Sequence, residues 1–359
     1  MPARPTILIT GAAGFLGSRI CEILHGGGAA TVRAGVRRWA SAARVGRLPV
    51  EIMPCDVRNA DQLRAALAGV TAVVHCAVGD REVTIDGTER LLEAARQDGV
   101  ERVVHISTIA VYGDQSGELG ESAPVQLTGS PYGDSKIAAE DLCREFAASP
   151  GAPHLTILRP SIVYGPFSQL WTIEFATRLQ TRPWPFPEEY CGGTCNLVYV
   201  DDVVGAILCA LRGGHRTGEA YNVNGPDRPT WNDYFHALNE AMGLPPIQAQ
   251  GVAVSRTMAT VMQPVRTSAK YVLKRFQPQV MALYHRSAAA KAIMKRAESA
   301  IRQTPTSDEF KLYSRIASYP TTKAATDLDF RARFDMWRGI EHSVAWLRHE
   351  GYLSTRTAT

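Results

Sequence analysis

Two side chains near the middle of the sequence could exchange protons with a bound molecule. Tyr132 and Lys136 are four residues apart, so on a helix they lie on the same face, one turn from each other. A free tyrosine has a pKa of roughly 10, and a neighbouring lysine cation should lower it because the cation favours the phenolate. The pair therefore suits general acid and base catalysis at a carbonyl or an alcohol. Alone, this spacing also occurs where a half-exposed tyrosine lies beside a surface lysine.

The residues before this pair offer a hydroxyl group that could hold the oxygen of a substrate. Ser107 and Thr108 follow an apolar run at 103–106 that is typical of a buried strand. Side chains directly after the strands of a parallel sheet lie at the edge where ligands bind. Either hydroxyl fits this role.

A glycine-rich turn near the start of the sequence is suited to binding a diphosphate. GlyAlaAlaGlyPheLeuGly at 11–17 follows an apolar run at 7–10 and opens a helical stretch. Glycine permits the tight turn and the close approach of backbone to pyrophosphate, and free N–H groups at the helix N-terminus attract the anion. A strand before the turn and a helix after it favour dinucleotide binding over an ordinary tight turn. The residues expected to contact the dinucleotide are Gly11, Gly14, Phe15, Leu16 and Gly17.

A second strand-like run, at 31–36, leads into residues that should select the dinucleotide. NAD sites carry a carboxylate about 20 residues after the glycine turn, where it binds the ribose hydroxyls. Here Val36 is followed by Arg37 and Arg38, with no acid. Guanidinium groups bind phosphate oxygens in pairs, so the sequence favours NADP, with NAD as the alternative. Two arginines that merely solvate a loop are the other interpretation.

Short β-rich runs alternate with helical stretches through the first half of the sequence. Such alternation implies right-handed crossovers and a parallel sheet covered on both faces. We predict an α/β fold, a Rossmann-type doubly wound parallel sheet with a smaller, mostly helical C-terminal substrate domain. The expected strands are 7–10, 31–36, 51–54, 72–76, 103–106, 155–158 and 196–200. The expected helices include the stretch that ends near residue 24, 63–67 and 89–95.

The alternation breaks after Pro166, which indicates a second part of the protein. We assign 1–170, together with 196–225, to the NAD(P)-binding Rossmann domain. The substrate-binding part then comprises 171–195 and 226–359, with a short helix within 226–250. Asp201 and Asp202 are expected to cap a helix that begins at Val203.

Composition excludes several classes of protein. With 45% hydrophobic and 21% charged residues among 359, the chain is near the globular average and is not disordered, collagen-like or a coiled coil. No apolar run approaches the roughly 20 residues that cross a bilayer. Seven scattered cysteines suit reduced thiols, and the first residues are not typical of a secretory signal. We expect a cytoplasmic protein.

Positive charge is concentrated in one segment. Residues 251–305 contain ten Lys or Arg and one acid, whereas the whole chain has a net charge of +4. We interpret the segment first as a solvated basic helix, with apolar residues near helical spacing over 280–302. It could instead close over an anionic substrate, or rest on anionic lipid and make the protein membrane-peripheral. Because the charge is local, no nucleic-acid partner is expected.

No metal site is expected. Cys191 and Cys195 resemble a metal spacing, but two isolated cysteines make a poor zinc site. The nine histidines form no ligand cluster. His75 and His105 lie within apolar runs and are interpreted as satisfied core residues rather than catalysts.

Ordered motifs along most of the chain make it resemble the extended short-chain dehydrogenase/reductases, the NAD(P)-dependent epimerases and dehydratases. Together the motifs are specific for the family, but they are poor at naming a substrate. They are the glycine turn at 11–17, CysAspVal at 55–57, HisCysAla at 75–77, GlyThrGluArgLeuLeuGluAla at 87–94, SerThrIleAlaValTyrGly at 107–113, Tyr132 with Lys136, LeuArgProSerIleValTyrGlyPro at 158–166, ValTyrValAspAspVal at 198–203, TyrAsnValAsnGly at 221–225, and the closing stretches at 323–330 and 344–348.

The resemblance implies a role for each matching residue. Thr108 falls on the catalytic Ser/Thr position, Tyr132 on the acid/base, and Lys136 on its partner, which could also bind the nicotinamide ribose. Residues implied to contact the cofactor elsewhere are Asp56 and Val57 at the adenine, Ala77 at the diphosphate, and Pro160 to Val163 beside the nicotinamide. Without the resemblance, Asp56 could merely end a strand and 160–163 could be core packing.

Three departures from the family pattern narrow the reaction. Sugar dehydratases of this family place Asp-Glu after the catalytic Thr, but Ile109 and Ala110 stand here and cannot move protons, so dehydration is disfavoured. Nucleotide-sugar enzymes usually carry Asn where this chain has Ile162. They also carry an arginine for the substrate diphosphate where Cys195 or Asn196 stands. Two anchors for a nucleotide-sugar are therefore missing, and cations of 251–305 could replace them.

These observations predict an NAD(P)-dependent oxidoreductase of the epimerase/dehydratase type that moves hydride at a secondary alcohol or ketone of a small molecule. A (nucleotide-)sugar epimerase or reductase is the main expectation. The alternative is an NADPH-dependent carbonyl reductase or an enzyme like 3β-hydroxysteroid dehydrogenase. A non-catalytic dinucleotide-binding sensor is a second alternative, which the intact catalytic set disfavours. Family members often dimerise through helices near 89–95 and 132–146, so the resemblance also implies a homodimer.

Overall fold

The chain forms two compact units that interleave along the sequence. The computed structural model describes residues 4–181, 184–249, 251, 257 and 306–353. The first unit comprises Met1–Ser168, Asn196–Asp227 and Ala317–Gly339. The second unit comprises Gln169–Cys195, Arg228–Ile316 and Ile340–Thr359.

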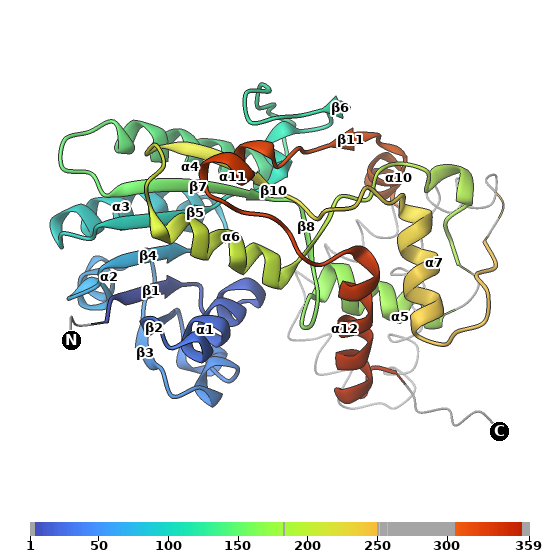
Figure 1. Ribbon diagram of the computed structural model, residues 1–359, viewed down its shortest axis with the longest axis horizontal. Coiled ribbons are helices and arrows are strands. Elements are labelled where there is room, and N and C mark those ends of the chain that lie inside the picture. Colours follow the sequence, from blue (N-terminus) through green and yellow to red (C-terminus); the bar gives the residue numbers. More distant parts are fainter. Residues whose placement is uncertain (1–3, 182–183, 250, 252–256, 258–305, 354–359) are drawn as a thin grey trace, which may run out of the picture. The chain divides into compact units, whose positions relative to one another are not determined.

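The first unit is built on a seven-stranded parallel sheet of order β10-β7-β5-β4-β1-β2-β3 (Figure 1). The strand order reverses at β1, which pairs with β4 on one side and β2 on the other. This reversal is the switch point at which doubly wound sheets bind ligands, so the predicted Rossmann-type fold is confirmed. The strands are β1 (Thr6–Thr10), β2 (Thr31–Val36), β3 (Glu51–Pro54), β4 (Ala72–His75), β5 (Arg102–Ile106), β7 (His154–Pro160) and β10 (Glu219–Val223).

Helices cover both faces of this sheet, as Figure 1 shows. Because successive side chains of a strand point to opposite faces, Ile7 and Ile9 pack in one buried core and Leu8 packs in the other. The first core holds apolar residues of α1 (Phe15–Gly27) and α6 (Val200–Arg212). The second holds those of α2 (Ala60–Leu67), α3 (Gly87–Gln97) and α4 (Pro131–Ala147). Near-continuous apolar runs are what a sheet buried on both faces requires.

Small sheets complete the first unit. The predicted strand at 196–200 is β9 (Leu197–Tyr199), which pairs with β8 (Ile162–Tyr164) outside the main sheet. β10, which was not predicted, fills the edge beside β7 instead. β6 (Gly117–Glu118) pairs with β11 (Ala317–Ser318), and α11 (Thr322–Asp327) follows.

The expected cap of α6 is wrong. The helix begins at Val200 after the extended residue Tyr199, so Asp201 and Asp202 lie in its first turn. Asp201 accepts two hydrogen bonds from the Arg19 guanidinium at 2.6 and 2.8 Å. Asp202 accepts backbone N–H groups of the segment 333–334, both at 2.9 Å. The two acids therefore bind neighbouring segments rather than their own helix end.

The contact of Asp202 with the segment 333–334 is one reason why the observed units differ from the predicted division of the chain. The sequence-based division gave 226–359 to the substrate-binding part, whereas 317–339 groups with the first unit. The reason is a set of specific contacts: β11 pairs with β6, the Lys323 ammonium contacts Glu219 of β10 at 2.6 Å, and Asp202 holds 333–334.

The described helices of the second unit pack around aromatic side chains. They are α5 (Glu174–Gln180), α7 (Trp231–Ala241) and α10 (Ser307–Ser314), with most of α12 (Met336–His349). Phe175, Trp231, Phe235 and Tyr313 are buried, and their ring centroids lie 4.5 to 6.4 Å apart. The basic segment 251–305, apart from Gly251 and Thr257, and the helix expected over 280–302 lie outside the described residues.

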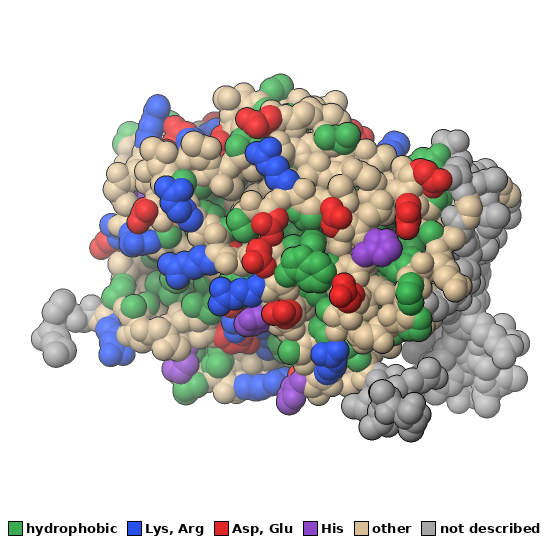
Figure 2. Space-filling view, turned by 45° about the vertical axis from the view of Figure 1, so that its right-hand side comes forward, with side chains coloured by type: hydrophobic (Ala, Val, Ile, Leu, Met, Phe, Trp, Pro, Cys, Tyr) green, Lys and Arg blue, Asp and Glu red, His purple; other side chains and the backbone are tan. Residues whose placement is uncertain are grey.

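Charges of both signs are interspersed on the described part of the face in Figure 2. None of the helices in the described part of the chain is both long and apolar enough to cross a bilayer.

Candidate active site

The start of α4 brings the predicted acid/base to the end of β5. Ser130 caps the helix, and Pro131 occupies its first position, where a missing N–H costs nothing. A Cβ on Gly133 would be only 3.3 Å from the carbonyl oxygen of Ala110, so the first turn of α4 lies close against the segment after β5. Tyr132 is therefore held beside Thr108, whose side chain is close enough to lower the pKa of the phenol.

Thr108, rather than Ser107, presents its hydroxyl at this position. Thr108 has an extended backbone with φ −166° and caps the short 3-10 helix η4 (Ile109–Tyr112). Its hydroxyl accepts a hydrogen bond from Ala110 N at 3.2 Å and lies near enough to Tyr132 to affect the pKa of the phenol. The Ser107 hydroxyl instead donates to the buried Glu140 carboxylate at 2.5 Å. The structure thus separates two hydroxyls that the sequence left as alternatives.

Lys136 lies one turn further along α4 and is buried, with 3% of its surface exposed. Its ammonium donates to the Ile106 carbonyl oxygen of β5 at 2.7 Å. Burial lowers the pKa of Lys136 to about 8, and the neighbouring Cys76, Cys143 and Glu140 oppose this shift.

The predicted direction of the tyrosine pKa is wrong for this structure. The side chain of Tyr132 is 47% exposed, yet the protein around the ring raises the pKa of the phenol, while the Thr108 side chain opposes the rise. Lys136 is not among the groups that shift this pKa, and its ammonium donates to a main-chain carbonyl of β5. The group that polarises the phenol here is the threonine hydroxyl.

The glycine turn has the geometry that a diphosphate requires. Gly11 has a φ of +66°, and a Cβ there would lie 3.0 Å from the backbone of Cys76 and Ala77. A Cβ on Gly17 would lie 2.9 Å from Ala12 Cα. α1 begins at Phe15 and continues through Leu16, and no side-chain hydrogen bond caps it at Gly14. Its N–H groups are thus oriented toward an anion, and the turn fits the dinucleotide of the family.

A chain of hydrogen bonds connects the glycine turn to β4, the strand that pairs with β1. Thr10, which ends β1, is hydrogen-bonded to Ala77 N at 3.3 Å and to His75 Nδ1 at 2.8 Å. The other ring nitrogen of His75 lies 3.0 Å from the Thr88 hydroxyl. Ala77 is thereby fixed beside Gly11, as its implied place at the diphosphate requires.

The adenosine end, after β2 and β3, is more open. Arg37 and Arg38 are exposed, and so is Trp39, at 62%. Asp56 accepts two hydrogen bonds from the Arg58 guanidinium, at 2.7 and 3.0 Å. Arg58, with a smaller contribution from Arg37, lowers the pKa of this carboxyl. Val57 is buried under Gly87.

Sequence reasoning missed Trp39, although an aromatic residue directly after the arginine pair was the available signal. An exposed indole beside two cations can stack on a base or a guanidinium.

Pro160 and Val163 lie where the chain passes from β7 into β8. Pro160 ends β7 and Val163 is the middle residue of β8. Between them, the Ser161 hydroxyl is hydrogen-bonded to the Asn224 side chain at 2.7 Å, and Asn224 contacts Asn196 at 3.3 Å. Asn224 was missed because nothing in its spacing separates it from a turn residue after a strand.

The two histidines interpreted as satisfied core residues differ. His75 has partners on both ring nitrogens, and burial lowers its pKa to about 3. His105 is also buried, but within the described part of the chain neither of its nitrogens has a hydrogen-bond partner. The expectation of a satisfied side chain is therefore wrong for His105. Cys191 and Cys195 are buried free thiols.

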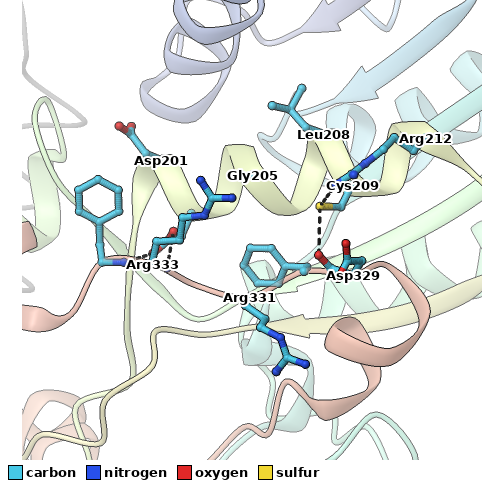
Figure 3. A pocket seen from close by; sticks show the side chains of 11 residues that line it. Asp201, Gly205, Leu208, Cys209, Arg212, Asp329, Arg331 and Arg333 are labelled. Carbon is cyan, nitrogen blue, oxygen red and sulfur yellow. Dashed lines mark hydrogen bonds between the residues drawn. The ribbon is translucent and has the colours of Figure 1, made fainter.

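A cavity of about 600 Å³ lies between α6 and the segment 329–334 (Figure 3). Its lining contains none of the predicted site residues. Two of its acids are engaged, Asp201 by Arg19 and Asp202 by the 333–334 backbone. In Figure 3 Arg331 points away from α6, whereas Arg333 reaches along it.

Comparison with known proteins decides the family. A model described as the NAD dependent epimerase/dehydratase family matches residues 7–224. The chain belongs to this family. It is accordingly an NAD(P)-dependent enzyme of the extended short-chain dehydrogenase/reductase type, and the resemblance found in the sequence is confirmed.

Three similar proteins illustrate the breadth of the epimerase/dehydratase family. An uncharacterized UDP-glucose epimerase, YtcB, of Bacillus subtilis is 29% identical over 253 residues, covering 62% of this chain and 77% of the relative. Sterol demethylase protein B of Methylococcus capsulatus is 32% identical over 271 residues, covering 69% and 80%. The structure of MoeE5 in complex with UDP-glucuronic acid and NAD superposes with a TM-score of 0.68 at 24% identity, covering 96% of this chain and 99% of MoeE5.

Proposed function

We propose that this protein is an NADP-dependent epimerase or reductase that acts at a secondary alcohol or ketone of a nucleotide-sugar. The observation that carries this proposal is the placement of the Thr108 hydroxyl beside the Tyr132 phenol at the end of β5, with Lys136 one turn along α4. A non-catalytic dinucleotide sensor would need the glycine turn but not Thr108, Tyr132 and Lys136 together. The presence of all three side chains therefore favours an enzyme.

In this proposal each side chain has a defined task. Thr108 holds the oxygen of the reacting carbon and, together with that oxygen, orients the Tyr132 phenol. Tyr132 gives a proton to the oxygen in reduction and takes it back in oxidation. Lys136 binds the ribose next to the nicotinamide. The nicotinamide, when bound, supplies or accepts the hydride.

The residues that would hold the cofactor follow the edge of the sheet. Gly11, Gly14 and Gly17 with the N-terminus of α1 hold the diphosphate, beside Ala77. The remaining proposed contacts are Phe15 and Leu16 in α1, Asp56 and Val57 at the adenine, and Pro160 and Val163 beside the nicotinamide. Arg37 and Arg38 are proposed to bind a 2′-phosphate, which supports NADP because no acid follows β2.

A nucleotide-sugar is supported by relatives of that kind, such as the UDP-glucose epimerase of Bacillus subtilis. Ile109 and Ala110 carry no titratable group, so elimination of water is disfavoured and epimerisation or net reduction is favoured.

An apolar ketone is the second candidate substrate. Val78, directly after Ala77, is 51% exposed, and Ile162 and Cys195 stand where polar anchors are common in nucleotide-sugar enzymes. The relative named sterol demethylase protein B supports the same direction.

One experiment separates these candidates. The purified protein is first analysed by mass spectrometry for co-purified NAD or NADP. It is then incubated with both cofactors, each in its oxidised and its reduced form, and a panel of UDP-, GDP- and dTDP-sugars and apolar ketones. We expect an epimerised or reduced nucleotide-sugar. Conversion of ketones alone would favour the second candidate, and a panel without any product would contradict the proposed catalysis.

A further inference from the structure

A buried ionic network lies directly behind the proposed catalytic groups. Its centre is Glu140 of α4, which has no exposed surface and lies one turn after Lys136. Arg159 of β7, with 1% of its surface exposed, binds both carboxylate oxygens of Glu140, at 2.9 and 2.6 Å. Two charge-assisted hydrogen bonds of this kind fix the relative orientation of the two groups.

The network reaches the proposed catalytic threonine through its neighbour in sequence. The Ser107 hydroxyl donates to the same carboxylate of Glu140 at 2.5 Å, and the Ser107 N–H donates to Leu158 O of β7 at 2.7 Å. Ser107 is thus held to α4 by its side chain and to β7 by its backbone. Thr108 follows directly, so its position depends on both contacts.

The far side of the network is closed by neutral groups. Arg159 also donates to the Tyr112 hydroxyl at 2.8 Å, and Tyr112 donates to the Asn222 side chain at 2.8 Å. Asn222 in turn donates to Leu119 O at 3.0 Å. Because the polar atoms of these side chains are paired, the network has one arrangement that satisfies every member.

We propose that Ser107, Glu140 and Arg159 are positioning residues that hold the Thr108 hydroxyl against the Tyr132 phenol. The proposal rests on the proposed function of those two side chains. It follows from the topology: Tyr132 and Lys136 belong to α4, whereas Thr108 belongs to the segment after β5. Glu140 is a buried side chain of α4 that is hydrogen-bonded both to that segment, through Ser107, and to β7, through Arg159.

Arg144 offers a matched control on the same carboxylate. Its guanidinium contacts Glu140 at 2.6 Å, but its side chain is 38% exposed and belongs to α4 itself. Removing the Arg144 side chain takes one positive charge away from Glu140. The hydrogen bonds that link Glu140 to Ser107 and to Arg159 of β7 remain.

The first measurement reports on the surroundings of the Tyr132 ring and therefore needs no substrate. 3-Fluorotyrosine is incorporated at position 132 in the full chain, and its fluorine resonance is recorded without cofactor and with NADP. In Ser107→Ala we expect the resonance to shift and broaden because the Thr108 hydroxyl is no longer held beside the phenol. Arg144→Ala should keep the resonance of the parent protein, and Ser107→Thr, which retains a hydroxyl, should restore it. Loss of stability alone would not move the resonance of the folded protein.

Turnover provides the second measurement, with the substrate found in the panel. Ser107→Ala should lower kcat by up to about 100-fold, the effect of displacing a reacting group by about 1 Å, with the Kd of NADP unchanged. Glu140→Asp is the second variant, and both readouts should change in the same direction. A resonance and kcat that stay unchanged in Ser107→Ala, or that change equally in Arg144→Ala, would overturn the proposal. If no compound is converted, the proposed function fails, but the fluorine resonance still decides whether the network positions Thr108.

Discussion

The charged side chains behind the proposed reacting groups are buried, whereas the two arginines at the proposed adenosine end are exposed. Glu140, Arg159 and Lys136 have between 0% and 3% of their surface accessible. Arg37 and Arg38, after β2, are exposed. Under the proposed function, the reacting groups are supported by the core of the fold, whereas the choice of cofactor would rest on exposed side chains.

The largest expected difference between the two regions is in the free energy of unfolding that is lost when a side chain of each region is replaced. Glu140→Gln leaves the Arg159 cation buried without its partner, which should lower the free energy of unfolding by about 3–5 kcal/mol. Arg37→Ala removes an exposed side chain and should change it by less than about 0.5 kcal/mol. Urea denaturation of both variants measures the difference. Equal losses would show that the two regions do not differ as described.

The buried ammonium of Lys136 provides a sharper test, because its effect depends on pH. Burial lowers the folded-state pKa of Lys136 to about 8, below the value of roughly 10.4 in the unfolded chain. Between these values the unfolded state binds more protons, so stability attributable to Lys136 rises with pH. Relative to Lys136→Met, the wild type should gain roughly 3 kcal/mol between about pH 7 and about pH 10.

Denaturation of both proteins across this range provides the measurement. Unfolded-state ionisation of the cysteines is common to both proteins and cancels, and burial raises the pKa of Cys76 to about 12 in the folded protein. His75 and His105, the other titratable groups near Lys136, are neutral throughout. A difference between the two proteins that does not vary with pH would mean that folding does not lower the pKa of Lys136.

The smallest expected effect is at the adenosine end. Arg37→Ala and Arg38→Ala should each weaken NADPH binding by about tenfold, the loss of one charge-assisted contact, and leave NADH binding unchanged. Titration of cofactor fluorescence gives both dissociation constants. If the wild type binds NADH and NADPH equally well, the arginines only solvate the loop.

Short sequence patterns predicted the elements whose structure depends on residues close to one another in the sequence. Apolar runs located six of the seven strands of the main sheet, and the glycine spacing located the turn before α1. β10 was missed because its run at 219–223 is short and mixed with polar residues. Its place at the sheet edge comes from pairing with β7, more than 60 residues earlier, and no local pattern carries that information.

The site shows the same division between local and long-range information. A four-residue spacing was enough to single out Tyr132 and Lys136 as candidates. It predicted a lowered tyrosine pKa, whereas the pKa is raised in the structure. The direction is set mainly by the burial of the phenol, and burial depends on the fold rather than on a four-residue spacing. Glu140 and Arg159 were not singled out, because each looks like an ordinary charged residue until the fold buries them together.

The measurement that tests the account most directly is the turnover of Tyr132→Phe with the converted compound from the panel. The variant keeps the ring but lacks the hydroxyl that exchanges the proton, so kcat should fall by about 10²–10⁴-fold. The Kd of NADPH should remain within about twofold, because the glycine turn and α1 are untouched. Normal turnover by Tyr132→Phe would contradict the assignment of this phenol as the acid/base.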